Sequence, residues 1–154
     1  LVGSEMCIRD RFKYSCFVNI VEEMELNLYP ESQRSVLFDL LSYANKIELN
    51  RLVLTTHSPY VINYLTLAAK AFLLTQKVSA NETLQERIKE VVPADSAIDP
   101  ARLRIYELKD GGVFRLSTYE GLPSDENFLN IQLGVTNELF DQLLEIEQEF
   151  DYKN

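Results

Sequence analysis

Reactive side chains occur in two short clusters, and each cluster follows a segment with the composition of a β-strand. Glu22 and Glu23 come directly after an apolar run, and Glu25 follows them after a single residue. The sequence TTHSP at residues 55–59 contains His57, the only histidine of the chain. Carboxylates this close together repel one another and are costly to desolvate. If the two clusters meet in the fold, their carboxylates and imidazole could converge on one ligand.

The first strand and the first helix are predicted from local signals. Residues 17–21 form an apolar run that is broken only by Asn19, which suits a strand buried on both faces. Pro30 has a fixed φ that suits a first helical turn, and Glu31 adds favourable charge at the helix N-terminus. The apolar residues of this helix recur at helical spacing and are Val36, Leu37, Leu40, Leu41, Ala44 and Ile47.

A second strand and a second helix follow in the same order. Residues 51–56, RLVLTT, are rich in residues that favour strands. Ser58 can cap the next helix and Pro59 can begin it, and the helix is expected to extend to about Ala69. Residues 71–75, AFLLT, predict a third strand.

This alternation predicts an α/β fold with a parallel sheet and right-handed crossovers. Ligands of such sheets bind beyond the carboxyl ends of the strands, where both clusters are expected. Simpler interpretations stay open, because a lone histidine after a strand is often a cap or a surface residue. An acidic pair at a strand end is about as often part of a solvated loop as it is part of a site. Since both clusters occupy the same point in consecutive strand–helix units, their joint occurrence favours a shared site.

The rest of the chain carries fewer signals. Residues 81–92 fit either an exposed helix or a mobile loop, and residues 103–121 predict a β-hairpin. The turn of this hairpin is formed by Asp110, Gly111 and Gly112. An amphipathic last helix is predicted from Leu139, Phe140, Leu143, Leu144 and Phe150. Its charged residues from 138 to 151 are all acidic, which is typical of a solvated helix face.

Composition restricts the class of protein. The chain has 154 residues, enough for one domain, and its formal net charge of −9 argues against a nucleic-acid footprint over the whole surface. Cys7 and Cys16 are too few for a disulfide framework or a zinc site, which fits a reducing cytoplasm. No apolar run reaches the roughly 20 residues that a membrane span needs. We therefore expect a cytoplasmic protein without a membrane partner.

The first residues of the chain resemble no protein element. Residues 1–11, LVGSEMCIRDR, have no clear period and resemble a translated sequencing adapter. They are therefore interpreted as a non-native artefact, and the fold is predicted without them. The genuine protein is expected to occupy residues 12–154, and Cys7 would then have no role.

Both clusters resemble motifs of a known family. The segment IVEEMELNLYPESQ resembles the extended Walker B segment of ABC-like ATPases of the AAA-15/AAA-21 and OLD (overcoming-lysogenization-defect) type. LVLTTHSPYVINYL resembles the switch segment of the same ATPases, and the two motifs occur in the expected order over residues 17–65. The resemblance implies the C-terminal half of a P-loop NTPase domain, with a mostly parallel sheet flanked by helices, a β-hairpin and a C-terminal helix.

The resemblance also implies roles, cofactors and partners. Glu22 matches the residue that holds Mg²⁺, Glu23 matches the catalytic carboxylate that polarises the attacking water, and His57 matches the switch histidine that contacts the γ-phosphate of ATP. Phosphoryl transfer needs charge neutralisation at the phosphates and an oriented nucleophile, and Mg²⁺ prefers hard oxygen ligands. The intact protein would be an ATPase that closes as a head-to-tail homodimer and acts on DNA or on an effector protein in DNA repair or anti-phage defence.

Two departures from the family pattern limit this interpretation. Met24 occupies the position where the family usually has proline, which leaves the turn after Glu23 less rigid. The 154 residues contain no Gly-x-x-x-x-Gly-Lys-Ser/Thr loop. We therefore interpret residues 12–154 as a truncated C-terminal lobe, which alone would bind ATP weakly if at all.

Two other functions stay open. Glu22, Glu23 and Glu25 could be the metal ligands of a phosphodiesterase or nuclease, although no separate Asp-x-Asp pair is found. The acidic last helix could instead dock a partner in a protein without enzymatic activity.

Overall fold

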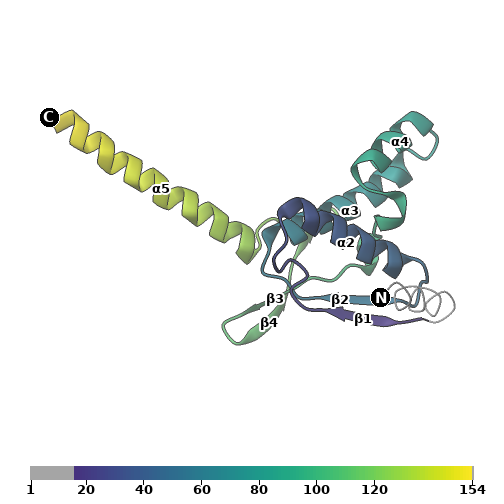
Figure 1. Cartoon of the computed structure of the whole chain (residues 1–154). Coiled ribbons are helices and arrows are strands. Elements are labelled where there is room, and N and C mark those ends of the chain that lie inside the picture. The colour runs from purple at the N-terminus through teal and green to yellow at the C-terminus, as the bar shows by residue number, and fades with distance from the viewer. Residues whose placement is uncertain (1–15, 154) are drawn as a thin grey trace. The chain divides into compact units, whose positions relative to one another are not determined.

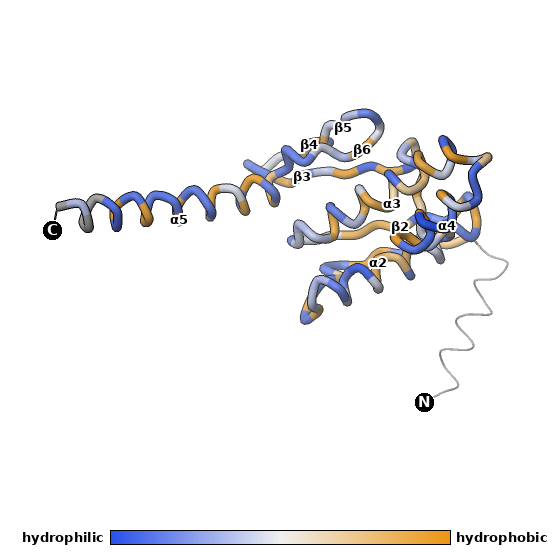
Figure 2. Tube along the Cα trace, turned by 90° about the horizontal axis from the view of Figure 1, so that it is seen from above, coloured by the Kyte–Doolittle hydropathy of each residue, from blue (hydrophilic) through white to orange (hydrophobic). Residues whose placement is uncertain are grey.

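The computed structural model describes residues 16–153, and for residues 149–151 and 153 it describes the backbone alone. Residues 1–11, which the sequence analysis interprets as a non-native artefact, lie outside the described residues together with Cys7. The described chain divides after Leu103 into two compact units. Figure 1 labels the helices and the strands β1 to β4, and Figure 2 also labels β5 and β6.

The first unit is built on a parallel pair of strands. Strand β1 (Val18–Val21) pairs with β2 (Arg51–Leu54), with Val18 opposite Arg51 and Val21 opposite Leu54. The predicted parallel pairing is therefore confirmed, and in the described residues this sheet has two strands. The two strands run level with each other, so their carboxyl ends emerge side by side.

Two helices cover one face of this strand pair. Helix α2 (Pro30–Asn45) begins at the predicted proline and packs against α3 (Pro59–Lys77), and both lie on the same side of the strands (Figure 1). Their buried apolar residues form the core: Leu37, Phe38 and Leu41 from α2, and Val61, Ile62, Leu65, Ala68, Ala69 and Ala71 from α3. The prediction that the first strand is buried on both faces is wrong for this unit, since Val18, Ile20 and Val53 on the other face of the sheet are 66%, 65% and 47% accessible.

The predicted third strand at residues 71–75 is wrong, because these residues continue helix α3. No glycine or proline interrupts the chain between Pro59 and Lys77. Ala68, Ala69 and Ala71 extend the buried face that Val61 and Leu65 begin. A short apolar run has no period that separates a strand from a buried helix, so the continuity of the helix decides.

Helix α4 (Glu82–Val91) settles the choice between helix and loop at residues 81–92. The side chain of Asn81 caps it, because its Oδ1 accepts a hydrogen bond of 3.1 Å from the Leu84 N–H. Two short 3₁₀ turns follow, Ala94–Ser96 and Pro100–Arg102.

The first of these turns is tied to α2 by polar contacts. The buried Ser96 Oγ donates to the Phe38 carbonyl at 2.9 Å, and Asn45 Nδ2 donates to the carbonyls of Asp95 and Ala97 at 2.8 and 2.9 Å. Because these bonds satisfy groups that would otherwise be costly to bury, they fix the end of the first unit to its core.

The second unit contains the predicted hairpin. Strands β3 (Tyr106–Lys109) and β4 (Gly112–Arg115) are antiparallel. Asp110 and Gly111 form the turn with φ values of 50° and 74°, as a type I′ turn requires. A second, shorter hairpin joins β5 (Thr118–Tyr119) to β6 (Leu122–Pro123).

The last helix, α5 (Phe128–Lys153), begins eleven residues before the first apolar position used to predict it. Its N-terminus is capped by Asn127 Oδ1, which accepts from the Asn130 N–H at 3.0 Å, and by Glu107 Oε1, which accepts from the Phe128 N–H at 2.6 Å. Hydrophobic and hydrophilic residues alternate along it (Figure 2), which fits the predicted amphipathic pattern. Among the described residues, no helix is long and apolar enough to cross a membrane.

Replacing Leu37 by alanine should lower the free energy of unfolding by about 2–5 kcal/mol, because this fully buried side chain would leave a cavity. Urea denaturation followed by circular dichroism measures the change. Val36→Ala on the same helix is the matched control, since Val36 is 36% exposed, and it should cost less than about 1 kcal/mol. Equal losses in the two variants would contradict the core described above.

Candidate functional site

The two reactive clusters meet where the parallel strands end. Beyond the last paired residues, the backbone ladder continues for one more step on each side. The Thr55 N–H donates to the Val21 carbonyl at 3.1 Å, and the Glu23 N–H donates to the Thr55 carbonyl at 3.0 Å. The acidic turn after β1 and the histidine segment after β2 are therefore neighbours, as the predicted position at the sheet edge required.

The acidic turn has an unusual backbone. Glu23 adopts a φ of 45°, in the left-handed region that non-glycine residues rarely occupy. The Glu23 N–H is shared between the carbonyl and the side-chain Oγ1 of Thr55, at 3.0 and 3.1 Å. The Glu23 carbonyl then accepts from the Leu26 N–H at 3.0 Å, which closes the turn. Strained backbone of this kind persists where surrounding contacts hold it, and it is frequent at functional sites.

The structure brings Glu23 and His57 together. The Nε2 of His57 lies 3.6 Å from the Oε1 of Glu23, so the two side chains form an ion pair when the imidazole is protonated. The His57 side chain is 85% exposed and that of Glu23 is 40% exposed. Both side chains are therefore accessible to a ligand that arrives at the strand ends.

Glu22 is exposed at the end of β1, which leaves its carboxylate accessible as a metal ligand. Among the described residues, no group of three or more His, Cys, Asp or Glu side chains is placed to hold a metal ion. Mg²⁺ is commonly held by one or two carboxylates together with water and substrate phosphates, and not by a cage of protein ligands. The donor set here fits that manner of binding by its chemistry.

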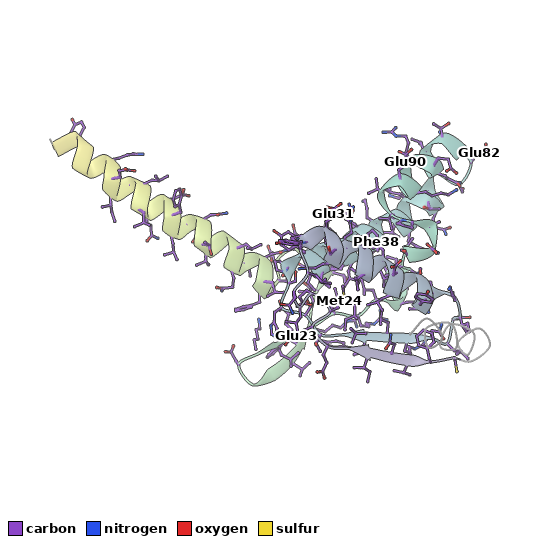
Figure 3. The ribbon with its side chains drawn as sticks, in the orientation of Figure 1. Glu23, Met24, Glu31, Phe38, Glu82 and Glu90 are labelled. Carbon is purple, nitrogen blue, oxygen red and sulfur yellow. The ribbon has the colours of Figure 1, made fainter. Side chains whose placement is uncertain are left out.

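Met24, at the position where the resemblance implies a proline, is part of the core. Its side chain is only 7% exposed and lies on the side of β1 that faces α2 (Figure 3). Burial of a methionine side chain stabilises the folded state by roughly 1.5–3 kcal/mol relative to leaving it exposed. We infer that this burial anchors the turn between Glu23 and Glu25 where a proline ring would have stiffened it.

Glu25 has a role in the sequence analysis only as a metal ligand of the alternative nuclease, yet in the structure it accepts two hydrogen bonds from the histidine segment. Its Oε1 accepts a hydrogen bond of 2.8 Å from Thr56 Oγ1 and one of 2.6 Å from the His57 N–H. Its Oε2 is buried, and it has no hydrogen-bond partner among the described residues. Glu25 therefore faces the histidine segment, which nothing in the local sequence indicated.

Ser58 occupies the predicted N-cap position of α3, but its hydroxyl has a different partner. Ser58 Oγ donates to Gln33 Oε1 at 2.7 Å, and both residues are 7% exposed. Gln33 Nε2 in turn donates to the Leu28 carbonyl at 2.9 Å. This buried pair joins α2 to the start of α3, at the residue that follows His57 in the chain.

One family model matches part of the chain. Residues 18–63 match a family model described as "AAA domain, putative AbiEii toxin, Type IV TA system". No curated protein and no solved structure matches the chain. The matched segment covers less than half of the chain but contains both clusters, and it supports an AAA-type P-loop ATPase family with a nucleotide-binding function.

Replacing Ser58 by alanine should destabilise the first unit by about 1–3 kcal/mol, because Gln33 Oε1 would lose its buried donor. Urea denaturation measures the change in the free energy of unfolding. Ser35→Ala is the matched control, since the Ser35 hydroxyl is exposed and bonds to the Glu31 carbonyl within its own helix. A loss no larger than that of the control would show that the pair contributes little to stability.

Proposed function

We propose that this chain supplies the acidic and histidine side of an ATP-hydrolysing site in a larger ABC-like AAA ATPase. The observation that carries the proposal is the 3.6 Å approach of His57 to Glu23 at the carboxyl ends of two parallel strands. Both residues lie within the segment that matches the AAA domain model. Parallel sheets bind their ligands at this edge, so the position and the chemistry agree.

The two side chains fit the two needs of phosphoryl transfer to water. The Glu23 carboxylate accepts a hydrogen bond from the attacking water and polarises it, while the exposed His57 imidazole contacts the γ-phosphate. The water oxygen forms a bond to the γ-phosphorus as the bond to the ADP oxygen breaks. Glu23 and His57 act from neighbouring strand ends, so one bound phosphate can meet both.

Glu22 is the residue that would hold Mg²⁺, which neutralises phosphate charge when it is bound. Its exposed carboxylate lies next in sequence to Glu23, and a cation there would reduce the repulsion between the two. This gives a physical reason for two adjacent carboxylates at one strand end.

The phosphate-binding loop has to come from elsewhere in the proposed ATPase, because these 154 residues contain no such loop. The exposed apolar face of the strand pair, with Val18, Ile20 and Val53, supports a unit that packs against further protein. Parallel sheets are normally covered on both faces. A head-to-tail homodimer, DNA or effector partners, and a role in DNA repair or anti-phage defence belong to the same proposal.

The structure disfavours the alternative of a nuclease with three glutamate ligands. The Oε1 of Glu25 accepts hydrogen bonds from the Thr56 hydroxyl and the His57 N–H, so this oxygen is already engaged by the protein. In the proposed ATPase Glu25 is not a metal ligand, so its bonds to Thr56 and His57 are consistent with that function.

The Glu23→Gln variant of the full-length gene product should bind ATP normally and lose about 10²–10⁴-fold in kcat, because a neutral amide polarises the attacking water much less than a carboxylate does. Nucleotide binding is measured by calorimetry and turnover by phosphate release. Glu31→Gln is the control, since Glu31 is exposed on α2 away from the strand ends (Figure 3). Wild-type turnover in the Glu23→Gln variant would overturn the assignment of this residue.

A further inference from the structure

We propose that Glu25 is a positioning residue, which holds the backbone of His57 so that the imidazole remains beside Glu23. The functional part of this proposal rests on the proposed ATPase function, whereas the structural part stands on the contacts of Glu25 alone. Its Oε1 accepts two hydrogen bonds from the histidine segment, at 2.8 Å from Thr56 Oγ1 and 2.6 Å from the His57 N–H.

The Glu25 side chain accepts hydrogen bonds from the residues that follow the end of the backbone pairing between β1 and β2. Backbone pairing ends with the bond from the Glu23 N–H to the Thr55 carbonyl, since the left-handed turn at Glu23 leads the chain away. The next residues after β2, Thr56 and His57, then have no strand backbone opposite them. The Glu25 carboxylate accepts from both, and so extends the pairing beyond the turn.

The bonds to Glu25 belong to a connected chain of donors and acceptors. The Ser58 N–H donates to Thr56 Oγ1 at 2.9 Å, and the Thr56 hydroxyl donates onward to Glu25 Oε1. Hydrogen bonds connected in this way polarise and strengthen one another, and those to an ionised carboxylate are stronger than neutral ones. The carboxylate therefore orders three consecutive residues, 56–58, at the start of α3.

The contact of the His57 imidazole with Glu23 is too weak to fix the orientation of the ring by itself. The His57 side chain is 85% exposed, and its distance of 3.6 Å to Glu23 is long for an ion pair. An exposed pair of this kind contributes little to order. The position of the ring is therefore set mainly by its backbone, which Glu25 fixes.

The two oxygens of the Glu25 carboxylate have different surroundings. Glu25 Oε2 is buried without a hydrogen-bond partner among the described residues. Burying an unpaired carboxylate oxygen is unfavourable, and such groups are uncommon in folded proteins. The Glu25 carboxylate is therefore held in place by the two bonds of its Oε1 to the histidine segment.

The structural part is tested by amide hydrogen exchange of the 154-residue chain, followed residue by residue with NMR. In Glu25→Ala, the His57 amide should exchange at least about tenfold faster, because its charge-assisted acceptor is gone. Glu25→Gln keeps the shape and a neutral acceptor, so it should fold normally and show a smaller increase. Glu31→Gln is the matched control and should leave the His57 amide unchanged.

The functional part is tested by ATP hydrolysis of the full-length gene product with the same variants. Glu25→Ala should lower kcat by at least about tenfold with a smaller change in KM, because a displaced histidine acts mainly on the transition state. Thr56→Ser keeps the hydroxyl and should retain activity, whereas Thr56→Val removes it and should reduce kcat.

The outcomes separate this proposal from the proposed function. An unchanged His57 exchange rate in Glu25→Ala would overturn the positioning role whether or not ATP is hydrolysed. Faster exchange with unchanged kcat would show that the contact has no functional consequence and would also overturn it. If the wild-type gene product hydrolyses no ATP, the proposed function fails, and the exchange comparison still decides whether Glu25 holds His57.

Discussion

The parallel pairing of β1 with β2 is the constraint on which the rest of the first unit depends. Because Val18 lies opposite Arg51 and Val21 opposite Leu54, the two strands end level with each other. The acidic turn and the histidine segment therefore leave the sheet at the same edge. Two strands alone are marginally stable, so the pair requires the buried faces of α2 and α3, which cover one side of it.

The crowding of carboxylates after β1 is resolved by placing each one in a different environment. Glu22 is exposed to solvent, Glu23 is partly exposed beside His57, and Glu25 is bonded to the histidine segment. The left-handed φ of Glu23 and the burial of Met24 produce this separation, since they reverse the chain within a few residues. Repulsion between the acidic groups is thereby reduced, and the most accessible carboxylates remain available for chemistry.

The two units rely on different physical devices. The first unit buries apolar helix faces and links its segments through polar pairs such as Gln33 with Ser58. The second unit is a hairpin followed by a long helix, and the carboxylate of Glu107 joins the two by accepting from the Phe128 N–H. In both units a glutamate side chain accepts a backbone N–H where regular pairing ends, because an ionised carboxylate is a strong acceptor for an otherwise unpaired donor.

The sequence by itself determined the elements that depend on local signals. Pro30 and Pro59 mark the starts of α2 and α3, and Asp110–Gly111 marks the hairpin turn, because each restricts its own backbone. The approach of Glu23 to His57 was also predictable, since parallel strands end at one edge. Only the tertiary structure decided that residues 71–75 continue a helix, that Met24 is buried, and that Glu25 and Ser58 bond as they do. These features depend on partners far away in the chain, and the packing of the folded unit selects such partners where no local pattern can.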